Sequence, residues 1–362
     1  MQKAVQLMVG LLLFGSAVVP AQAAFTMLQV FGDSISTTTN NTGGQANFYY
    51  GKRYTNGRVW VEVLAQRQGL ILYPTNNWSF FYNSSTTMLA NVSSFQAPSD
   101  VNMSNILFVI WVNCADLWFP ATYSGTSMNA WTNAINQSQT NHYKAATNLY
   151  ARGARILIMP NAVDVSAIPE FDSSVNANFI HLRCLDYNVA FSNTLNRIRA
   201  SCPNLTLYEP DFFTLLTNML AHAANYGLTN TLCDGVSIDA ADAFNCGFPT
   251  AATNGYGTNY IFWDLRDPTA MVHMWMANTA QQLISPVQIS QITALNGSNQ
   301  LVMVNVPVGQ NGLVLGCTNL LAPGWQTNVT FVGTNATQSV YVTNSGPQWF
   351  YRLKFPYSWT WP

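Results

Sequence analysis

Two continuous apolar runs set the strongest limit on how this chain can fold. Residues 106–112 read ILFVIWV and residues 156–159 read ILIM, with no polar position that would mark a solvent-facing side. Strands without alternation are typical of a parallel sheet that is buried on both faces by helices. Gly153 and Pro160 bound the second run, as expected for a strand between two turns.

Such strands alternate with helical patterns from residue 25 to about residue 285, which predicts an α/β domain with a parallel sheet. We expect strands at 27–32, 69–73, 105–113, 155–160 and 205–209. We expect helices at 56–68, 129–152, 174–200, 212–225 and 269–284.

The pattern changes after Ser285-Pro286. Short runs such as LVMVNV, TFV, SVYV and WFY are separated by turns rich in Gly, Asn and Pro. This pattern of short apolar runs and turns predicts a small all-β module, which we interpret as a β-sandwich. The expected division is therefore a domain over 24–285 followed by a β module over 286–362.

The first 23 residues have the pattern of a secretory signal peptide. Lys3 supplies the positive start, residues 5–19 are almost wholly apolar, and Ala21-Gln22-Ala23 is a small-residue cleavage site. The apolar core is too short for a membrane span, and no later segment is long and apolar enough. We therefore expect a secreted or periplasmic protein without a transmembrane span.

Charge is scarce, because only 8% of the residues are Asp, Glu, Lys or Arg, against about a quarter in typical domains. The 14 basic residues form no patch, so we expect no nucleic-acid partner. No Cys/His spacing resembles a metal site, and we expect neither a metal nor another cofactor.

Six cysteines fit an oxidising compartment without a dense disulfide framework. Cys233 and Cys246 flank a polar loop and are the best candidate pair. Cys184 and Cys202 are not expected to pair with each other, because a helix between them would span about 27 Å, whereas a disulfide needs Cα atoms within about 7 Å. The two cysteines in apolar strand patterns are expected to be buried thiols: Cys114 and Cys317.

Three sequence blocks occur in a recognisable order: FGDSIS at 31–36, RYTNGRVW at 53–60 and FWDLRDPT at 262–269. The first resembles the nucleophile block of the GDSL (SGNH) lipase/acylhydrolase family, and the others resemble its R-x-S/T-N-G-R-V-W and F-W-D-x-x-H-P-T segments. The resemblance covers roughly residues 25–284, so it is far more specific than Gly-Asp-Ser alone.

The resemblance implies a three-layer α/β/α, flavodoxin-like fold and hydrolysis of an ester of a lipid or an acylated carbohydrate. Ser34 matches the nucleophile and Asp264 matches the acid that orients the catalytic histidine. The family's oxyanion site combines the serine N–H, a glycine N–H and an asparagine amide. These elements fall on Ser34, Ser84 and Ala115.

Asp267 stands where the family has its histidine, and this is the decisive departure. An aspartate with a pKa near its ordinary value of about 3.9 is a much weaker base than an imidazole near about 6.5. Crowding against Asp264 can raise one of the two pKa values. Ser84 replaces a glycine and Ala115 replaces the asparagine; Asn113, two residues earlier, would lie on the same face of a strand.

Two functions follow from this sequence. The first is a secreted GDSL-type ester hydrolase whose activity is weak or lost because Asp267 replaces the histidine. The second is a non-catalytic SGNH-fold protein that binds a glycan, a lipid or a cell surface, with the C-terminal module as a candidate for that contact. We interpret the chain's histidines, His273 included, as structural.

Overall fold

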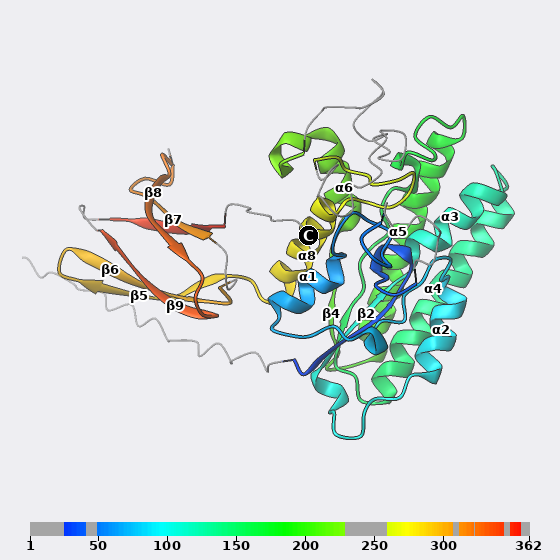
Figure 1. The fold of residues 1–362 in the computed structure, drawn as a ribbon, viewed down its shortest axis with the longest axis horizontal. Coiled ribbons are helices and arrows are strands. Elements are labelled where there is room, and N and C mark those ends of the chain that lie inside the picture. The colour runs from blue at the N-terminus through cyan, green and yellow to red at the C-terminus, as the bar shows by residue number, and fades with distance from the viewer. Residues whose placement is uncertain are drawn as a thin grey trace, which may run out of the picture.

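The computed structural model describes residues 25–40, 49–228, 259–306, 311–321, 323–343 and 348–355. Its larger part is a four-stranded parallel sheet between two layers of helices (Figure 1). The strands are β1 (Met27–Gly32), β2 (Ile106–Trp111), β3 (Ile156–Ile158) and β4 (Thr206–Tyr208), which pair in the order β1-β2-β3-β4. The predicted α/β domain with a parallel sheet is thus confirmed.

The strand expected at 69–73 is wrong. Ile71 is 67% exposed and Tyr73 is 56% exposed, so this segment lies outside the sheet. Among the described residues, one parallel bridge between Val30 and Asn77 meets the free edge of β1, where the Trp78 N–H donates to the Val30 carbonyl at 2.8 Å. With this bridge in the place of an edge strand, the connections follow the flavodoxin-like order 2-1-3-4-5.

Helices cover both faces of the sheet, with α1, α6 and α8 on one side and α2, α3, α4 and α5 on the other (Figure 1). Their bounds are α1 (Trp60–Arg67), α2 (Ser85–Ser94), α3 (Asn113–Tyr123), α4 (Met128–Ala151), α5 (Ala177–Ser201), α6 (Phe212–Ala221) and α8 (Ala270–Ile284). Short 3₁₀ turns connect them: η1 (Ser34–Ser36), η2 (Pro74–Asn76), η3 (Met103–Asn105), η4 (Val165–Ala167) and η5 (Ala223–Tyr226).

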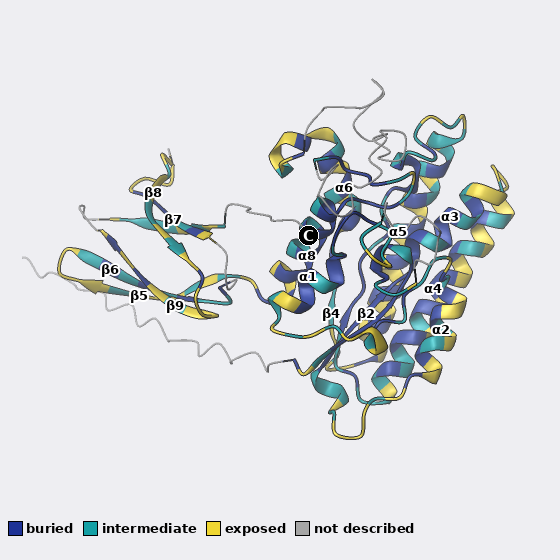
Figure 2. Cartoon of the chain, viewed as in Figure 1, coloured by how far each residue is buried: buried dark blue, intermediate teal, exposed yellow. Residues whose placement is uncertain are grey.

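The sequence did not predict α2 and α3, and both have weak local signals. The α2 segment reads STTMLANVSS, which is rich in residues of low helix propensity. Pro120 lies inside α3, where it removes a backbone donor. Both helices form because tertiary packing buries one face, for example Met88 and Val92 of α2 (Figure 2).

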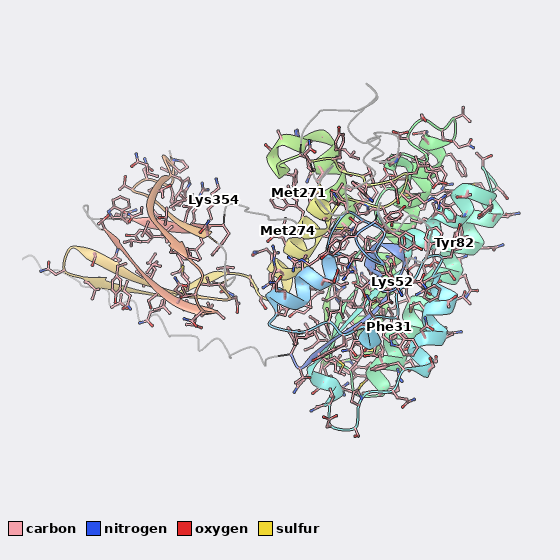
Figure 3. The ribbon with its side chains drawn as sticks, in the orientation of Figure 1. Phe31, Lys52, Tyr82, Met271, Met274 and Lys354 are labelled. Carbon is pink, nitrogen blue, oxygen red and sulfur yellow. The ribbon has the colours of Figure 1, made fainter. Side chains whose placement is uncertain are left out.

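On the side of the sheet that carries α1 and α8, aromatic side chains join the helices to the sheet. Trp60 of α1 meets Trp111 of β2 edge to face, with ring centroids 5.8 Å apart, and meets Phe212 of α6 at 5.4 Å. All three rings are buried, as expected for large aromatic side chains in a core. Arg67 of α1 also donates to the sulfur of Met274 of α8 at 3.2 Å. Figure 3 labels Met274 on this helix.

The C-terminal part is a small module of two antiparallel three-stranded sheets. The strands are β5 (Gln288–Leu295), β6 (Ser298–Val304), β7 (Asn311–Cys317), β8 (Gln326–Val332), β9 (Thr337–Thr343) and β10 (Phe350–Lys354). Leu301 of β6, Val314 of β7 and Val340 of β9 share one buried cluster, so both sheets contribute to the same core. The predicted small β module is confirmed.

Four of the six cysteines lie in the described part of the chain. Cys114 and Cys317 are buried free thiols, as predicted, and Cys184 and Cys202 do not pair with each other and are also buried and free. The suspected Cys233–Cys246 pair and the signal peptide at 1–23 lie outside the described residues. Among the described helices, none is long and apolar enough to cross a membrane.

The turn after β1 is fixed by close packing and by a buried carboxylate. A side chain at Gly32 would place its Cβ 2.7 Å from the Ser36 Cβ, so only glycine fits there. Asp33 is 2% exposed, and its Oδ1 accepts the Ile35 N–H at 3.2 Å, which closes the turn at the end of β1. Burial raises the pKa of Asp33 to about 7.

This raised pKa predicts a pH-dependent stability. Asp33 stabilises the folded state in full below the pKa of the unfolded carboxyl, near 3.8, and the contribution is lost as the pH rises through about 7. Asp33→Asn keeps the accepting oxygen but cannot titrate. We expect the difference in unfolding free energy between pH 5 and pH 8 to shrink by about 2 to 3 kcal/mol in this variant.

Urea denaturation of the wild type and Asp33→Asn at the two pH values measures this difference. The wild type should be more stable at pH 5 than at pH 8. An unchanged pH dependence in Asp33→Asn would mean that the Asp33 carboxyl titrates near its ordinary value in the folded protein.

Candidate active site

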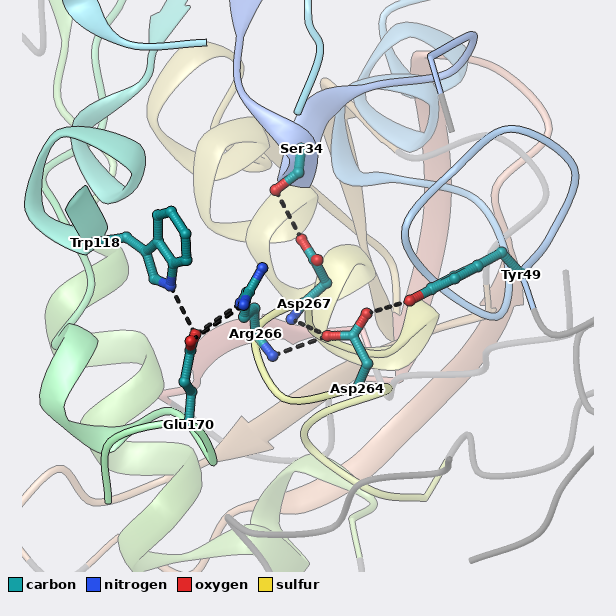
Figure 4. Close-up of polar contacts among 7 residues, drawn as sticks. All are labelled: Ser34, Tyr49, Trp118, Glu170, Asp264, Arg266 and Asp267. Carbon is teal, nitrogen blue, oxygen red and sulfur yellow. Dashed lines mark hydrogen bonds and ion pairs between the residues drawn. The ribbon is translucent and has the colours of Figure 1, made fainter. Parts of the chain in front are cut away.

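Ser34 lies at the carboxyl end of β1, in the first position of η1. This is the point where the order of a doubly wound sheet reverses, which is where such folds place their sites. Its hydroxyl donates a hydrogen bond to Oδ1 of Asp267 at 2.9 Å (Figure 4). The fold therefore brings together two residues that are 233 positions apart and that the sequence singled out independently.

Asp264 shapes the turn that presents Asp267. Its Oδ1 accepts the backbone N–H groups of Arg266 and Asp267, both at 2.8 Å. Its Oδ2 accepts the hydroxyl of Tyr49 at 2.7 Å (Figure 4). Three donors thus stabilise the charged form of this carboxylate. Burial and the Asp264 charge raise the pKa of Tyr49, which keeps its hydroxyl protonated as a donor.

The block at residues 53–60 holds this turn in place. The Thr55 hydroxyl donates to the Pro268 carbonyl at 2.8 Å, directly after Asp267. The Asn56 side chain accepts the Ala270 N–H at 2.9 Å, where α8 begins. These bonds fix the backbone that directly follows Asp267 in the chain. They therefore support the position of the Asp267 carboxylate.

His273 completes the same support. Burial lowers the pKa of His273 to about 3, so its ring is neutral and its Nδ1 accepts the Trp60 N–H at 3.2 Å. The ring is 1% exposed within α8 and joins that helix to the start of α1. These contacts fit the structural role expected for His273.

The Asp267 carboxylate is 2% exposed and occupies a strongly anionic environment. Burial above all, and then the charges of Asp264 and Asp33, raise the pKa of Asp267 well above its ordinary value. The Ser34 hydroxyl and the Arg266 guanidinium act in the opposite direction but do not cancel this effect. When ionised, Asp267 is therefore a stronger base than a solvent-exposed aspartate.

The residues expected at the oxyanion site are only partly brought together. Ser84 precedes α2, and the next N–H, of Ser85, donates to Asp116 of α3 at 2.9 Å. Ala115 lines the pocket beside Ser34, whereas Asn113 does not. The expectation that Asn113 and Ala115 share a strand face is wrong, because α3 begins at Asn113. The fully buried Asn113 amide instead donates to the Pro160 carbonyl at 2.9 Å.

A pocket opens in front of Ser34, between loops that follow β1, β2 and β3. One side is aromatic, formed by Phe81, Tyr82 and Trp118. Tyr82 has a φ of 63°, a left-handed conformation that is uncommon for a large side chain. The opposite side is aliphatic and includes Val163, Val165 and Ile168.

Arg266 lies at the rim of this pocket and its charge is paired. Its Nε donates to Glu170 at 2.7 Å, and the guanidinium lies over the Trp118 ring, 4.5 Å from the centroid. Trp118 donates to the same Glu170 carboxylate at 2.6 Å (Figure 4). Sequence inspection did not identify Tyr49, Glu170 or Arg266, because none stands in a distinctive motif position.

No histidine lines the pocket among the described residues, which include all four histidines of the chain. His142 is bonded within its own helix, where its Nδ1 donates to the Ser138 carbonyl at 2.8 Å. His181 pairs with Asp164 on the outer side of η4 at 2.5 Å. Ser34 therefore has a carboxylate as its neighbour and no imidazole in the pocket.

Curated relatives of the chain are named GDSL esterase/lipase or thermolabile hemolysin. A GDSL esterase/lipase from Arabidopsis thaliana is 24% identical over 346 residues, which cover 78% of this chain and 88% of the relative. The thermolabile hemolysin of Vibrio parahaemolyticus is 22% identical over 265 residues, which cover 68% of this chain and 60% of the relative. No family model matches the chain.

Solved structures give weaker likenesses. A catalytic mutant of an acetylxylan esterase from Geobacillus stearothermophilus has a TM-score of 0.39 at 12% identity, covering 71% of this chain and 93% of that one. An extracellular lipase from Streptomyces rimosus has a TM-score of 0.38 at 12% identity, covering 70% and 98%. Similarity at this level carries no weight for the assignment. The ordered blocks and two curated relatives named GDSL esterase/lipase carry the comparison instead, and by them the chain resembles the GDSL (SGNH) lipase/acylhydrolase family.

Proposed function

We propose that the protein hydrolyses carboxylic esters, with Ser34 as the nucleophile and Asp267 as its general base. One observation carries this proposal: the Ser34 hydroxyl donates to the Asp267 carboxylate at 2.9 Å, inside a pocket that both residues line. A general base must lie within hydrogen-bond reach of the proton it removes, and this pair meets that requirement.

The reaction follows from this geometry. Asp267 takes the hydroxyl proton while the Ser34 oxygen bonds to the ester carbonyl carbon, which gives a tetrahedral oxyanion. The alcohol oxygen receives that proton from Asp267 as its bond to carbon breaks, leaving an acyl-serine. Water then repeats both steps: it loses a proton to Asp267, attacks the acyl carbon and releases the carboxylic acid and a free Ser34 hydroxyl.

We assign the oxyanion to backbone donors. The Ser34 N–H is the first candidate, because the oxyanion forms on the carbon that bonds to its own side chain. Ser84 supplies the second candidate at the start of α2. The family's amide donor has no counterpart, since Ala115 lacks one and Asn113 is bonded to Pro160. Loss of one such donor costs about 10² to 10³ in turnover in other hydrolases.

The change in charge of the general base on accepting the proton explains why we expect slow turnover. In a triad, the imidazole becomes a cation that the neighbouring aspartate stabilises. Here Asp267 becomes neutral on accepting the proton, so Asp264 stabilises no new charge. The negative charge of Asp264 acts before the proton is transferred, because it raises the pKa of Asp267 and makes Asp267 a better proton acceptor. The same effect lowers the fraction of Asp267 that is ionised near neutral pH.

The substrate class and the location extend the proposal. We propose esters of lipids or of acylated carbohydrates as substrates, and action outside the cytoplasm after removal of residues 1–23. The domain limits at 24–285 and 286–362 belong to the same proposal. The end of α8 at Ile284 and the start of β5 at Gln288 support the position of that boundary.

A non-catalytic ligand-binding protein is the second candidate function. The observation that favours it is the pocket, which has a polar end formed by Asp33, Ser34 and Asp267 and no histidine among its described lining residues. The ligand would be a glycan, a lipid or a cell-surface component, with the β module as a further contact. In that case Ser34→Ala should keep the affinity for the ligand, and Asp267→His should create esterase activity that the wild type lacks.

The catalytic proposal predicts the effect of three variants on short-chain nitrophenyl ester hydrolysis. Ser34→Ala should abolish turnover, because no acyl-enzyme can form. Asp267→Asn has nearly the same shape but cannot accept the proton, and it should lower kcat/KM by about 10² to 10⁴. Thr330→Ala, a change on an exposed strand of the β module, is the matched control and should have wild-type kinetics. Equal turnover in wild type and Asp267→Asn would contradict the proposal.

The rate should also depend on pH in one direction. Because Asp267 must be ionised to accept the proton and its pKa is raised, kcat/KM should rise with pH. The midpoint should lie well above the ordinary aspartate value of 3.8. Initial rates across this range, in buffers of constant ionic strength, measure the profile. A plateau already reached below pH 5 would show that Asp267 is not the titrating base.

A further inference from the structure

A second hollow adjoins the Ser34 pocket and differs from it in chemistry. It lies between α6, α8 and the end of β2, on the side of the sheet that carries α1 and α8. Its walls include Leu215 and Leu216 of α6, Val272 and Met276 of α8, and Trp111 of β2. Every described residue that lines it is apolar, with the exception of Arg266.

The two hollows meet at four residues that line both: Ile35, Val163, Ile168 and Arg266. Ile35 directly follows Ser34, and Arg266 directly precedes Asp267. The apolar hollow therefore adjoins the Ser34 pocket at residues next to Ser34 and Asp267 in the chain. The shared lining residues are apolar apart from the paired Arg266, so they place no unpaired polar group between the Ser34 pocket and the apolar hollow.

Arg266 does not make the second hollow polar. Its guanidinium is paired with Glu170 through two hydrogen bonds, of 2.7 and 3.1 Å, and lies over the Trp118 ring. The charged end is thus directed to the aromatic side of the first pocket. A ligand with a carboxylate or a phosphate deep in the second hollow would find no free cation among the described lining residues.

We propose that this apolar hollow binds the acyl chain of the ester, and that the protein prefers medium-length or long acyl chains over acetyl groups. This inference rests on the proposed ester hydrolysis at Ser34. The alcohol part leaves through the side of the first pocket where Tyr82 is 46% exposed, because that side is open to water. Burial of each methylene should raise kcat/KM by about fourfold until the hollow is filled.

The selectivity should depend on Leu215. This side chain is half-buried in α6 and lines the hollow, so a larger ring there would occupy part of the space for the chain. Leu220 lies in the same helix and is also half-buried, but it does not line the hollow. Leu215→Trp and Leu220→Trp are therefore a matched pair that differs in access to the hollow.

The experiment compares para-nitrophenyl acetate, butanoate, octanoate and decanoate as substrates. In the wild type, kcat/KM should rise by at least about tenfold from acetate to octanoate. Leu215→Trp should reduce the octanoate-to-acetate ratio by at least about tenfold, whereas Leu220→Trp should leave the ratio unchanged. Melting temperatures of both variants show whether the fold persists; if Leu215→Trp is destabilised, the smaller Leu215→Phe replaces it.

A binding measurement separates this inference from the proposed catalysis. Calorimetric titration of Ser34→Ala with methyl octanoate and methyl acetate needs no turnover. Tighter binding of the octanoate, lost in Ser34→Ala/Leu215→Trp, supports the acyl hollow even if the wild type hydrolyses nothing. Turnover without any chain-length preference, or equal binding of both esters, would overturn the inference.

Discussion

The hydrogen bond between Ser34 and Asp267 is the contact on which the rest of the site depends. It joins the end of the first strand to a turn near the last helix of the α/β domain. Neither residue is positioned by its own side chain alone. Asp264 closes the turn that carries Asp267, while Thr55 and Asn56 hold the backbone that follows it. The motif at residues 53–60 thus has a physical role that its sequence does not reveal.

Three carboxylates, Asp33, Asp264 and Asp267, lie around one serine hydroxyl. Burial above all raises the pKa values of Asp33 and Asp267, and the charges of Asp264 and Asp33 add to this effect at Asp267. The same charges that cost stability at high pH supply Asp267 with basicity that an ordinary aspartate lacks. Perturbed titration is a frequent mark of functional sites, and the site's open, apolar pocket gives this one a place for substrate.

The sequence predicted the buried strands well, because uninterrupted apolar runs such as 106–112 have few alternatives to a central parallel strand. The strand that the sequence predicted at 69–73 is wrong, because this segment follows α1 with Ile71 exposed and is not part of the sheet. The sequence placed Ser34, Asp264 and Asp267 by motif. The orientation of Asn113 could not be predicted, because it depends on α3 beginning one residue after Val112, and Tyr49 and Glu170 reach the site only through tertiary folding.

Covalent labelling by a fluorophosphonate tests the pairing of Ser34 with Asp267 most directly, because it reports the reactivity of the hydroxyl without requiring a natural substrate. Intact-mass spectrometry would follow the reaction over time in wild type, Ser34→Ala and Asp267→Asn. The account predicts one phosphonyl group on Ser34 in the wild type and at least about a hundredfold slower reaction in Asp267→Asn. Equal labelling of wild type and Asp267→Asn, or no labelling of wild type at all, would contradict it.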